Sequence, residues 1–116
     1  MTDSILDSVK EGLLIVDTYT AFDSQLIDYI NSSLGIIAQC GYEPAKDFEV
    51  TGPNEYWSDL IDDSRFNMLK TFVKMRVHLL FDPPSSSFAL SQLKEDIEEF
   101  EWRIRAEVET GERILI

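Results

Sequence analysis

The sequence of 116 residues contains one cysteine, one histidine, and only 10 lysines and arginines against 22 acids. Because Cys40 has no second cysteine to pair with, an internal disulfide and a paired-cysteine metal site are excluded, and a reducing cytoplasm fits this composition. No apolar run reaches the roughly 18 residues of a membrane-spanning helix, and the N-terminus carries acids where a signal peptide carries a basic region. We therefore expect one soluble domain with a modest core.

The motifs of common catalytic sites are also missing. The sequence has no glycine-rich phosphate loop, no H-E-x-x-H, no EF-hand loop and no G-x-S-x-G. His78 has apolar neighbours in sequence and no evident nucleophile or orienting group, so we interpret it as structural or interfacial. Cys40 directly precedes Gly41, and we expect a partly buried free thiol. The sequence therefore predicts no enzyme activity, no cofactor and no metal site.

The formal net charge is −12 at pH 7. DNA-binding proteins gain affinity by neutralising phosphates with positive side chains, so tight DNA binding is a poor candidate function. Three interpretations of the acidity stay open. It keeps the protein soluble, it provides a surface that DNA slides past without sticking, or it imitates DNA as a decoy.

Two apolar stripes at helical spacing dominate the C-terminal half and predict an antiparallel helical hairpin. Pro83 and Pro84 stop the first helix, and the serines that follow offer hydroxyls to cap the second. A connection this short makes the two helices antiparallel neighbours. The first stripe comprises Phe66, Leu69, Phe72, Val73, Val77 and Leu80, and the second comprises Leu90, Leu93, Ile97, Phe100 and Ile104.

The N-terminal part predicts two further helices. The first runs from about Ser4 to Leu13, with Ser4 and Asp7 as a weak capping box. The second begins near Phe22, with Asp23 as its cap, and ends at Gly41, which suits the left-handed residue that closes a helix.

The segment 42–54 loses helical periodicity and predicts the longest irregular loop of the domain. Within this loop, residues 48–51 either form a brief strand or lie flat on the helices. A short helix opened by Pro53 or Asn54 follows the loop. Its expected buried residues are Tyr56, Trp57, Leu60 and Ile61.

The second helix of the hairpin is acidic on its outer side, at Glu95, Asp96, Glu98 and Glu99. Such a run is typical of a solvated helix face, and a contact surface is the alternative. Trp102 lies about 160° from Phe100 around the helix and off the apolar stripe, so it either widens the core or faces a neighbouring subunit.

The last residues differ from the helix before them. We expect Gly111 to end that helix and to leave an apolar end, because Ile114, Leu115 and Ile116 are all large and apolar. Chain ends tend to be disordered unless something holds them in place. This tail either folds back onto its own bundle or adds as a strand to the sheet of another protein.

Several segments, in their order, resemble the small head-tail connector proteins of tailed bacteriophages and prophages. The similarity spans about residues 4–105, and its most specific parts are residues 80–87 and 101–103. The segments are S-I-L-D-S-V-K (4–10), F-D (22–23), I-N-S (30–32), W-S-D-L-I (57–61), V-H-L-L-F-D-P-P-S-S-S (77–87) and E-F-E-W-R-I (99–104).

The resemblance implies a virion protein of the neck, present in the host cytoplasm during assembly. Such connectors are helical bundles that assemble as a homo-oligomeric ring, usually of twelve copies, beneath the portal protein. They join the capsid to tail or neck proteins, without contact to a membrane. They also line the channel through which DNA passes without specific binding, and an acidic lining suits this passage because each phosphate contact would retain the genome.

The resemblance also assigns candidate sites. A ring needs two different complementary patches on each copy. The inter-subunit candidates are Trp102, Tyr42, Phe48 and Pro53; the channel or surface acids are Glu95, Asp96, Glu98 and Glu99; and the portal-docking tail is Glu112, Arg113, Ile114, Leu115 and Ile116.

The predicted fold is therefore all-α: a bundle of four to five helices over residues 1–109, with an antiparallel C-terminal hairpin and an extended tail at 110–116. The alternative function is an acidic DNA-mimic inhibitor of phage origin. Its carboxylates would follow the phosphate spacing of a duplex along one face.

Overall fold

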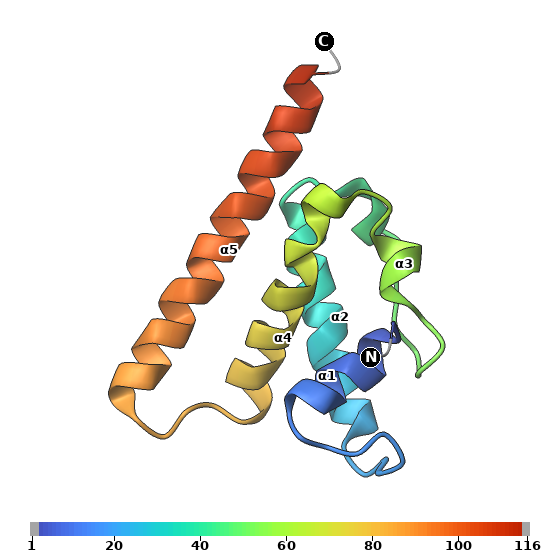
Figure 1. The fold of residues 1–116 in the computed structure, drawn as a ribbon, viewed down its shortest axis with the longest axis vertical. Coiled ribbons are helices and arrows are strands. Elements are labelled where there is room, and N and C mark those ends of the chain that lie inside the picture. The colour runs from blue at the N-terminus through green and yellow to red at the C-terminus, as the bar shows by residue number, and fades with distance from the viewer. Residues whose placement is uncertain (1–2, 115–116) are drawn as a thin grey trace.

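The computed structural model describes residues 3–114, with side chains described through Gly111, and this part of the chain is all-helical (Figure 1). It contains no strand, only an isolated bridge between Ser4 and Tyr56. The all-α prediction is therefore confirmed for these residues. The helices are α1 (Ile5–Gly12), α2 (Asp23–Gln39), η1 (Glu43–Ala45), α3 (Trp57–Leu60), η2 (Ser64–Phe66), α4 (Met68–Phe81) and α5 (Ser87–Ile114), where η marks a 3-10 helix.

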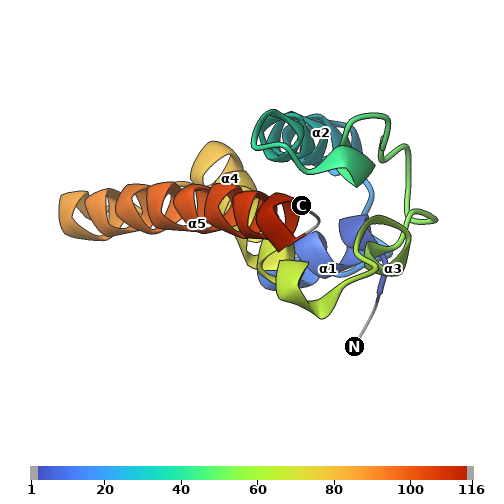
Figure 2. The same ribbon diagram turned by 90° about the horizontal axis from the view of Figure 1, so that it is seen from above.

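Helix α4 is the centre of the fold. It packs against α1, α2 and α5, and its Leu69, Phe72, Val73 and Val77 are fully buried, as the first apolar stripe predicts. In the view from above, α5 extends away from α1 and α2 (Figure 2). The core is centred on α4. It takes buried residues from α1, α2, α3 and the loop after α2, and α5 adds Ile97 and Ile104.

The first helix begins as the sequence predicts. Ser4 is its N-cap, and its hydroxyl accepts a hydrogen bond from the backbone N–H of Asp7 at 3.3 Å. Near the end of α1, Lys10 is buried and donates from Nζ to the carbonyl of Asp17 at 3.0 Å and to Asp23 Oδ1 at 2.8 Å. This lysine fixes the turn between α1 and α2.

The predicted cap of α2 is wrong. Phe22 occupies the N-cap position without a side-chain hydrogen bond, and Asp23 is the first helical residue. The carboxylate of Asp23 pairs with Lys10, and an acid in the first turn also suits the helix dipole. The predicted end of α2 is confirmed, because Gly41 follows it with φ of +102°.

The loop after α2 is irregular, as predicted, apart from η1. Residues 48–51 form no strand. They follow the other prediction and lie against the helices, since Val50 is buried. The side-chain amide of Asn31 bonds both backbone groups of Val50, accepting from its N–H and donating to its carbonyl, each at 2.9 Å. One asparagine thus supplies the pairing that a neighbouring strand would supply.

The short helix α3 buries Trp57 and Leu60, as predicted, but Tyr56 is exposed. Tyr56 is the N-cap residue of α3, and its backbone pairs with Ser4 while its ring stays outside the core. Trp57 donates from Nε1 to Ser8 Oγ at 2.8 Å, which ties α3 to α1.

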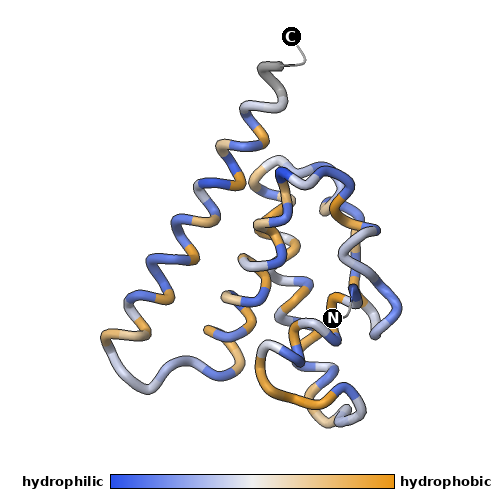
Figure 3. The backbone as a smooth tube through the Cα atoms, in the orientation of Figure 1, coloured by the Kyte–Doolittle hydropathy of each residue, from blue (hydrophilic) through white to orange (hydrophobic). Residues whose placement is uncertain are grey.

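Helices α4 and α5 run in opposite directions on either side of the proline turn (Figure 1). Ser86 caps α5 by accepting a hydrogen bond from the N–H of Ala89 at 3.2 Å. Hydrophobic positions recur along α5 (Figure 3). Of those whose side chains the structure describes, only Ile97 and Ile104 are buried, and Leu90 and Leu93 near the turn are half-buried. Near the turn, α5 therefore packs on α4 less closely than the predicted hairpin does, and Leu80 of the first stripe is also exposed there.

The sequence predicts that Gly111 ends the last helix. In the structure α5 instead continues to Ile114. An extended tail from residue 110 is therefore wrong for residues 110–114. A glycine inside a helix costs only about 1 kcal/mol, less than a proline would, so a long helix can run through it. Leu115 and Ile116 lie outside the described residues.

Gly41 offers a test of how α5 is attached. A Cβ added there would lie 3.0 Å from Val108 Cγ1 of α5, and the positive φ is unfavourable for any other residue. We expect Gly41→Ala to lower the free energy of unfolding by about 1–3 kcal/mol, measured by urea denaturation.

The matched control is Gly35→Ala within α2. No atom lies within 4 Å of an added Cβ at Gly35. This substitution should raise stability by about 0.5–1 kcal/mol, as for alanine in a helix interior. Equal effects of the two substitutions would contradict the contact between Gly41 and Val108.

Candidate interaction surfaces

The outer face of α5 carries two exposed aromatic side chains. Phe88 is 80% exposed and Trp102 is 69% exposed. At about 100° per residue they point within roughly 40° of each other, about 21 Å apart along the helix. Trp102 therefore does not widen the core, and its contact with a neighbouring subunit stays a prediction.

The acids predicted for this face are mostly exposed. Glu95, Glu98 and Glu99 are exposed, and Asp96 is half-buried. Glu99 pairs with Arg103 at 3.0 Å, and Asp96 accepts a hydrogen bond from Gln92 at 3.0 Å. By contrast, Glu95 and Glu98 form no ion pair or side-chain hydrogen bond with the described residues, so their charges are free to meet a partner.

The loop residues predicted as inter-subunit contacts divide into two kinds. Tyr42 is only 5% exposed; its hydroxyl donates to the carbonyl of Leu60 at 2.7 Å, and its ring packs on Phe66. Tyr42 therefore stabilises its own subunit and offers little surface to a neighbour. Phe48 is half-buried and Pro53 is exposed, so these two positions keep some surface.

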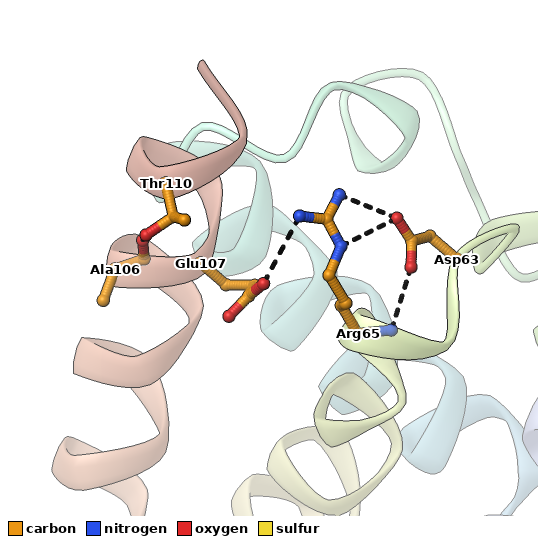
Figure 4. Close-up of polar contacts among 5 residues, drawn as sticks. All are labelled: Asp63, Arg65, Ala106, Glu107 and Thr110. Atoms are coloured by element: carbon orange, nitrogen blue, oxygen red, sulfur yellow. Dashed lines mark hydrogen bonds and ion pairs between the residues drawn. The ribbon is translucent and has the colours of Figure 1, made fainter. Parts of the chain in front are cut away.

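Arg65 holds the upper part of α5 to the rest of the chain (Figure 4). Its Nη2 lies 2.8 Å from Asp63 Oδ2, and its Nη1 lies 3.6 Å from Glu107 Oε1 on α5. The hydrogen bonds from the Arg65 side chain and backbone lower the pKa of Asp63, and Asp63 raises the pKa of Arg65. One turn further along, Thr110 donates to the carbonyl of Ala106.

The predicted portal-docking tail is only partly described. The backbone is helical to Ile114, and the last turns of α5 extend past the other helices (Figure 1). The side chains of Glu112, Arg113 and Ile114, and all of Leu115 and Ile116, lie outside the described residues. The structure therefore gives the direction of this segment and none of its contacts.

Sequence reasoning missed an exposed apolar loop after α1. Leu14 is 94% exposed and has a φ of +63°, and Val16 is 67% exposed. Figure 3 shows this loop as a hydrophobic stretch. Leu14 follows the C-cap of α1, a position that glycine commonly occupies because its backbone is left-handed. The end of the predicted helix near Leu13 is the signal that could have identified this loop.

The residues that could have supported catalysis are not brought together. His78 is exposed, and its ring forms no hydrogen bond or ion pair with the part of the chain that the structure describes. Cys40 is buried, more fully than the sequence predicts, and burial raises the pKa of its thiol. Within residues 3–111, no group of histidine, cysteine and acids could hold a metal ion.

One cavity of about 160 Å³ lies between the N-terminal segment, α3 and the start of α4. Its polar groups include Ser58, which donates to Asp3 at 2.6 Å, and no histidine lines it. Its lining residues are Asp3, Trp57, Ser58, Ile61, Asn67 and Lys70.

The described helices include no apolar segment of the length that a membrane span requires.

The fold and these surfaces define a small helical protein whose exposed aromatic and acidic faces suit contacts with other macromolecules. The chain belongs to the phage connector protein family, since residues 5–111 match the model of that family. Comparisons with curated proteins and with solved structures gave no match. The protein is thus a virion component with a role in head-tail connection, in a structural family not known for enzymes.

The pKa of Tyr42 predicts how the free energy of unfolding depends on pH. Burial, and then the charges of Asp62 and Asp63, raise the pKa of Tyr42 to about 12. The unfolded chain has a tyrosine pKa of about 10, so the stability from the neutral phenol is present below pH 10 and is lost as pH rises to 12. The free energy of unfolding should therefore fall more steeply between these values than in Tyr42→Phe.

At neutral pH, Tyr42→Phe should cost about 1 kcal/mol because the hydrogen bond to Leu60 is lost. Urea denaturation at several pH values measures both effects. Parallel pH profiles for the two proteins would show that Tyr42 ionises as readily in the folded as in the unfolded chain.

Proposed function

We propose that this protein forms a homo-oligomeric ring, usually of twelve copies, beneath a portal protein and joins the capsid to tail or neck proteins. The observation that carries the proposal is the outer face of α5, where Phe88 and Trp102 are exposed to solvent. Exposed aromatics are enriched in protein interfaces. Family membership supplies the head-tail context.

The charge of the chain supports a role around DNA that does not retain it. With a net charge of −12, the protein repels phosphates. We propose that Glu95, Asp96, Glu98 and Glu99 lie on the channel or on the outer surface of the ring. DNA would then pass without specific binding.

The C-terminal segment is proposed to dock on the portal protein. Helix α5 leads residues 112–114 past the other helices, so this segment starts away from its own core (Figure 1). The docking residues would be Glu112, Arg113, Ile114, Leu115 and Ile116.

The alternative of a DNA mimic receives less support. A mimic needs carboxylates at the spacing of phosphates along one face, whereas Arg103 and Arg105 pair with Glu99 and Glu101 within the acidic helix. No described contact favours that function over the connector role.

Removal of residues 113–116, or Trp102→Ala, should block the joining of heads and tails in the parent phage. A loss of only about 1.4 kcal/mol per contact lowers affinity about tenfold, and repeated contacts in a ring multiply the effect. Electron microscopy would count free heads and tails, and a plaque assay would count infectious particles.

The matched control is Asp28→Ala, at an exposed position of α2. This variant should assemble normally. Normal head-tail joining by both the truncated and the Trp102 variants would overturn the proposed role of α5 and its end.

A further inference from the structure

The outward side of α4 is basic in an otherwise acidic protein. Helix α4 contains Lys70, Lys74 and Arg76 and no acid. Lys74 and His78 are exposed and Lys70 is half-buried, and their spacing of four residues places all three on one side of the helix. We name Lys70, Lys74 and His78 the basic face of α4.

Arg76 does not belong to this face. It is half-buried, and its Nε donates to Ser33 Oγ of α2 at 3.2 Å. None of the ion pairs between described side chains involves the basic face. Its charges therefore have no described partner within the subunit.

The outer face of α5 is complementary. It presents Glu95 and Glu98, which are also without a partner among the described side chains, next to the exposed ring of Trp102. We name Glu95, Glu98 and Trp102 the acidic face of α5. No described ion pair joins α4 to α5 in one subunit, because the two helices pack through their apolar sides.

We propose that the basic face of α4 in one copy receives the acidic face of α5 in a second copy. With the helices antiparallel, Lys70 meets Trp102, Lys74 meets Glu98 and His78 meets Glu95, because both faces repeat at steps of three or four residues. A lysine on a tryptophan ring is itself attractive. Because each copy carries both faces, the contact is head-to-tail and can be repeated around a ring.

This inference rests on the proposed ring and names its contact. It places Glu95 and Glu98 between copies, so of the four acids proposed for the channel or outer surface only Asp96 and Glu99 keep that place.

The second copy is favoured over DNA as the occupant of the basic face. The face holds two lysines and one histidine in a chain of net charge −12, so phosphates are repelled overall. Another copy offers an acid to Lys74 and to His78 and an aromatic ring to Lys70.

Disulfide cross-linking between two different single-cysteine variants tests the contact. Cys40→Ala removes the native thiol, and Lys74→Cys in one variant is mixed with Glu98→Cys in the other. Oxidation should join the two variants at least about tenfold more than it joins Lys46→Cys with Glu98→Cys, because Lys46 lies on the loop near η1. Equal yields would overturn the contact.

Sedimentation of the wild-type chain separates the two proposals. If the chain forms oligomers but the Lys74 and Glu98 variants are not joined preferentially, the contact is wrong and the ring stands. If the chain stays monomeric up to about 1 mM, both the contact and self-assembly of the ring are overturned.

Charge reversal gives an independent readout. Lys74→Glu and Glu98→Lys should each weaken self-association about fivefold to tenfold, and the double variant should return to within about twofold of the wild type. Circular dichroism checks that the helices remain folded. A double variant as weak as the single ones overturns the pairing.

Binding to a short DNA duplex at low salt tests the competing occupant. The contact predicts that Lys74→Glu changes self-association and not DNA binding. Loss of duplex binding with unchanged self-association would assign the basic face to nucleic acid and overturn the contact between copies.

Discussion

Burial of one side of α4 is the constraint on which the rest of the structure depends. Leu69, Phe72, Val73 and Val77 are all 0% exposed, and full burial of such a side chain contributes about 1.5–3 kcal/mol. The apolar side of α4 must therefore stay covered by α1, α2 and α5. Only its opposite side, which is basic, is left for contacts outside the subunit.

A few polar side chains hold the segments that are not regular. Asn31 fixes the loop at Val50, Lys10 fixes the turn after α1, and the indole of Trp57 bonds Ser8. Each polar group is buried or half-buried and satisfied, so removing one partner would leave the other unpaired at a cost of about 1–3 kcal/mol. These contacts give a defined shape to a chain with long connections.

Helix α5 relates this fold to its family role. It is 28 residues long, yet among its apolar side chains up to Gly111 only Ile97 and Ile104 are buried. A helix that contributes so little to its own core exposes most of its length, and Glu95, Glu98 and Trp102 occupy that exposed side. The same helix is tied back at Glu107 and Val108, so its exposed side is held in a fixed orientation.

Local chemistry in the sequence determined the helices, the proline turn, the left-handed Gly41 and the resemblance to the connector family. These features depend on neighbours within a few residues, or on short motifs, and so can be read from the chain. The tertiary structure alone decided the partner of Asp23, the burial of Tyr42, the exposure of Tyr56 and Leu14, and the continuation of α5 through Gly111. Each of these depends on which distant segments lie next to the residue. Lys10 of α1 donates a hydrogen bond to Asp23 of α2, and the carbonyl of Leu60 accepts one from the hydroxyl of Tyr42. Sequence spacing carries no information about such contacts, because the burial of a side chain is set by the elements that pack over it.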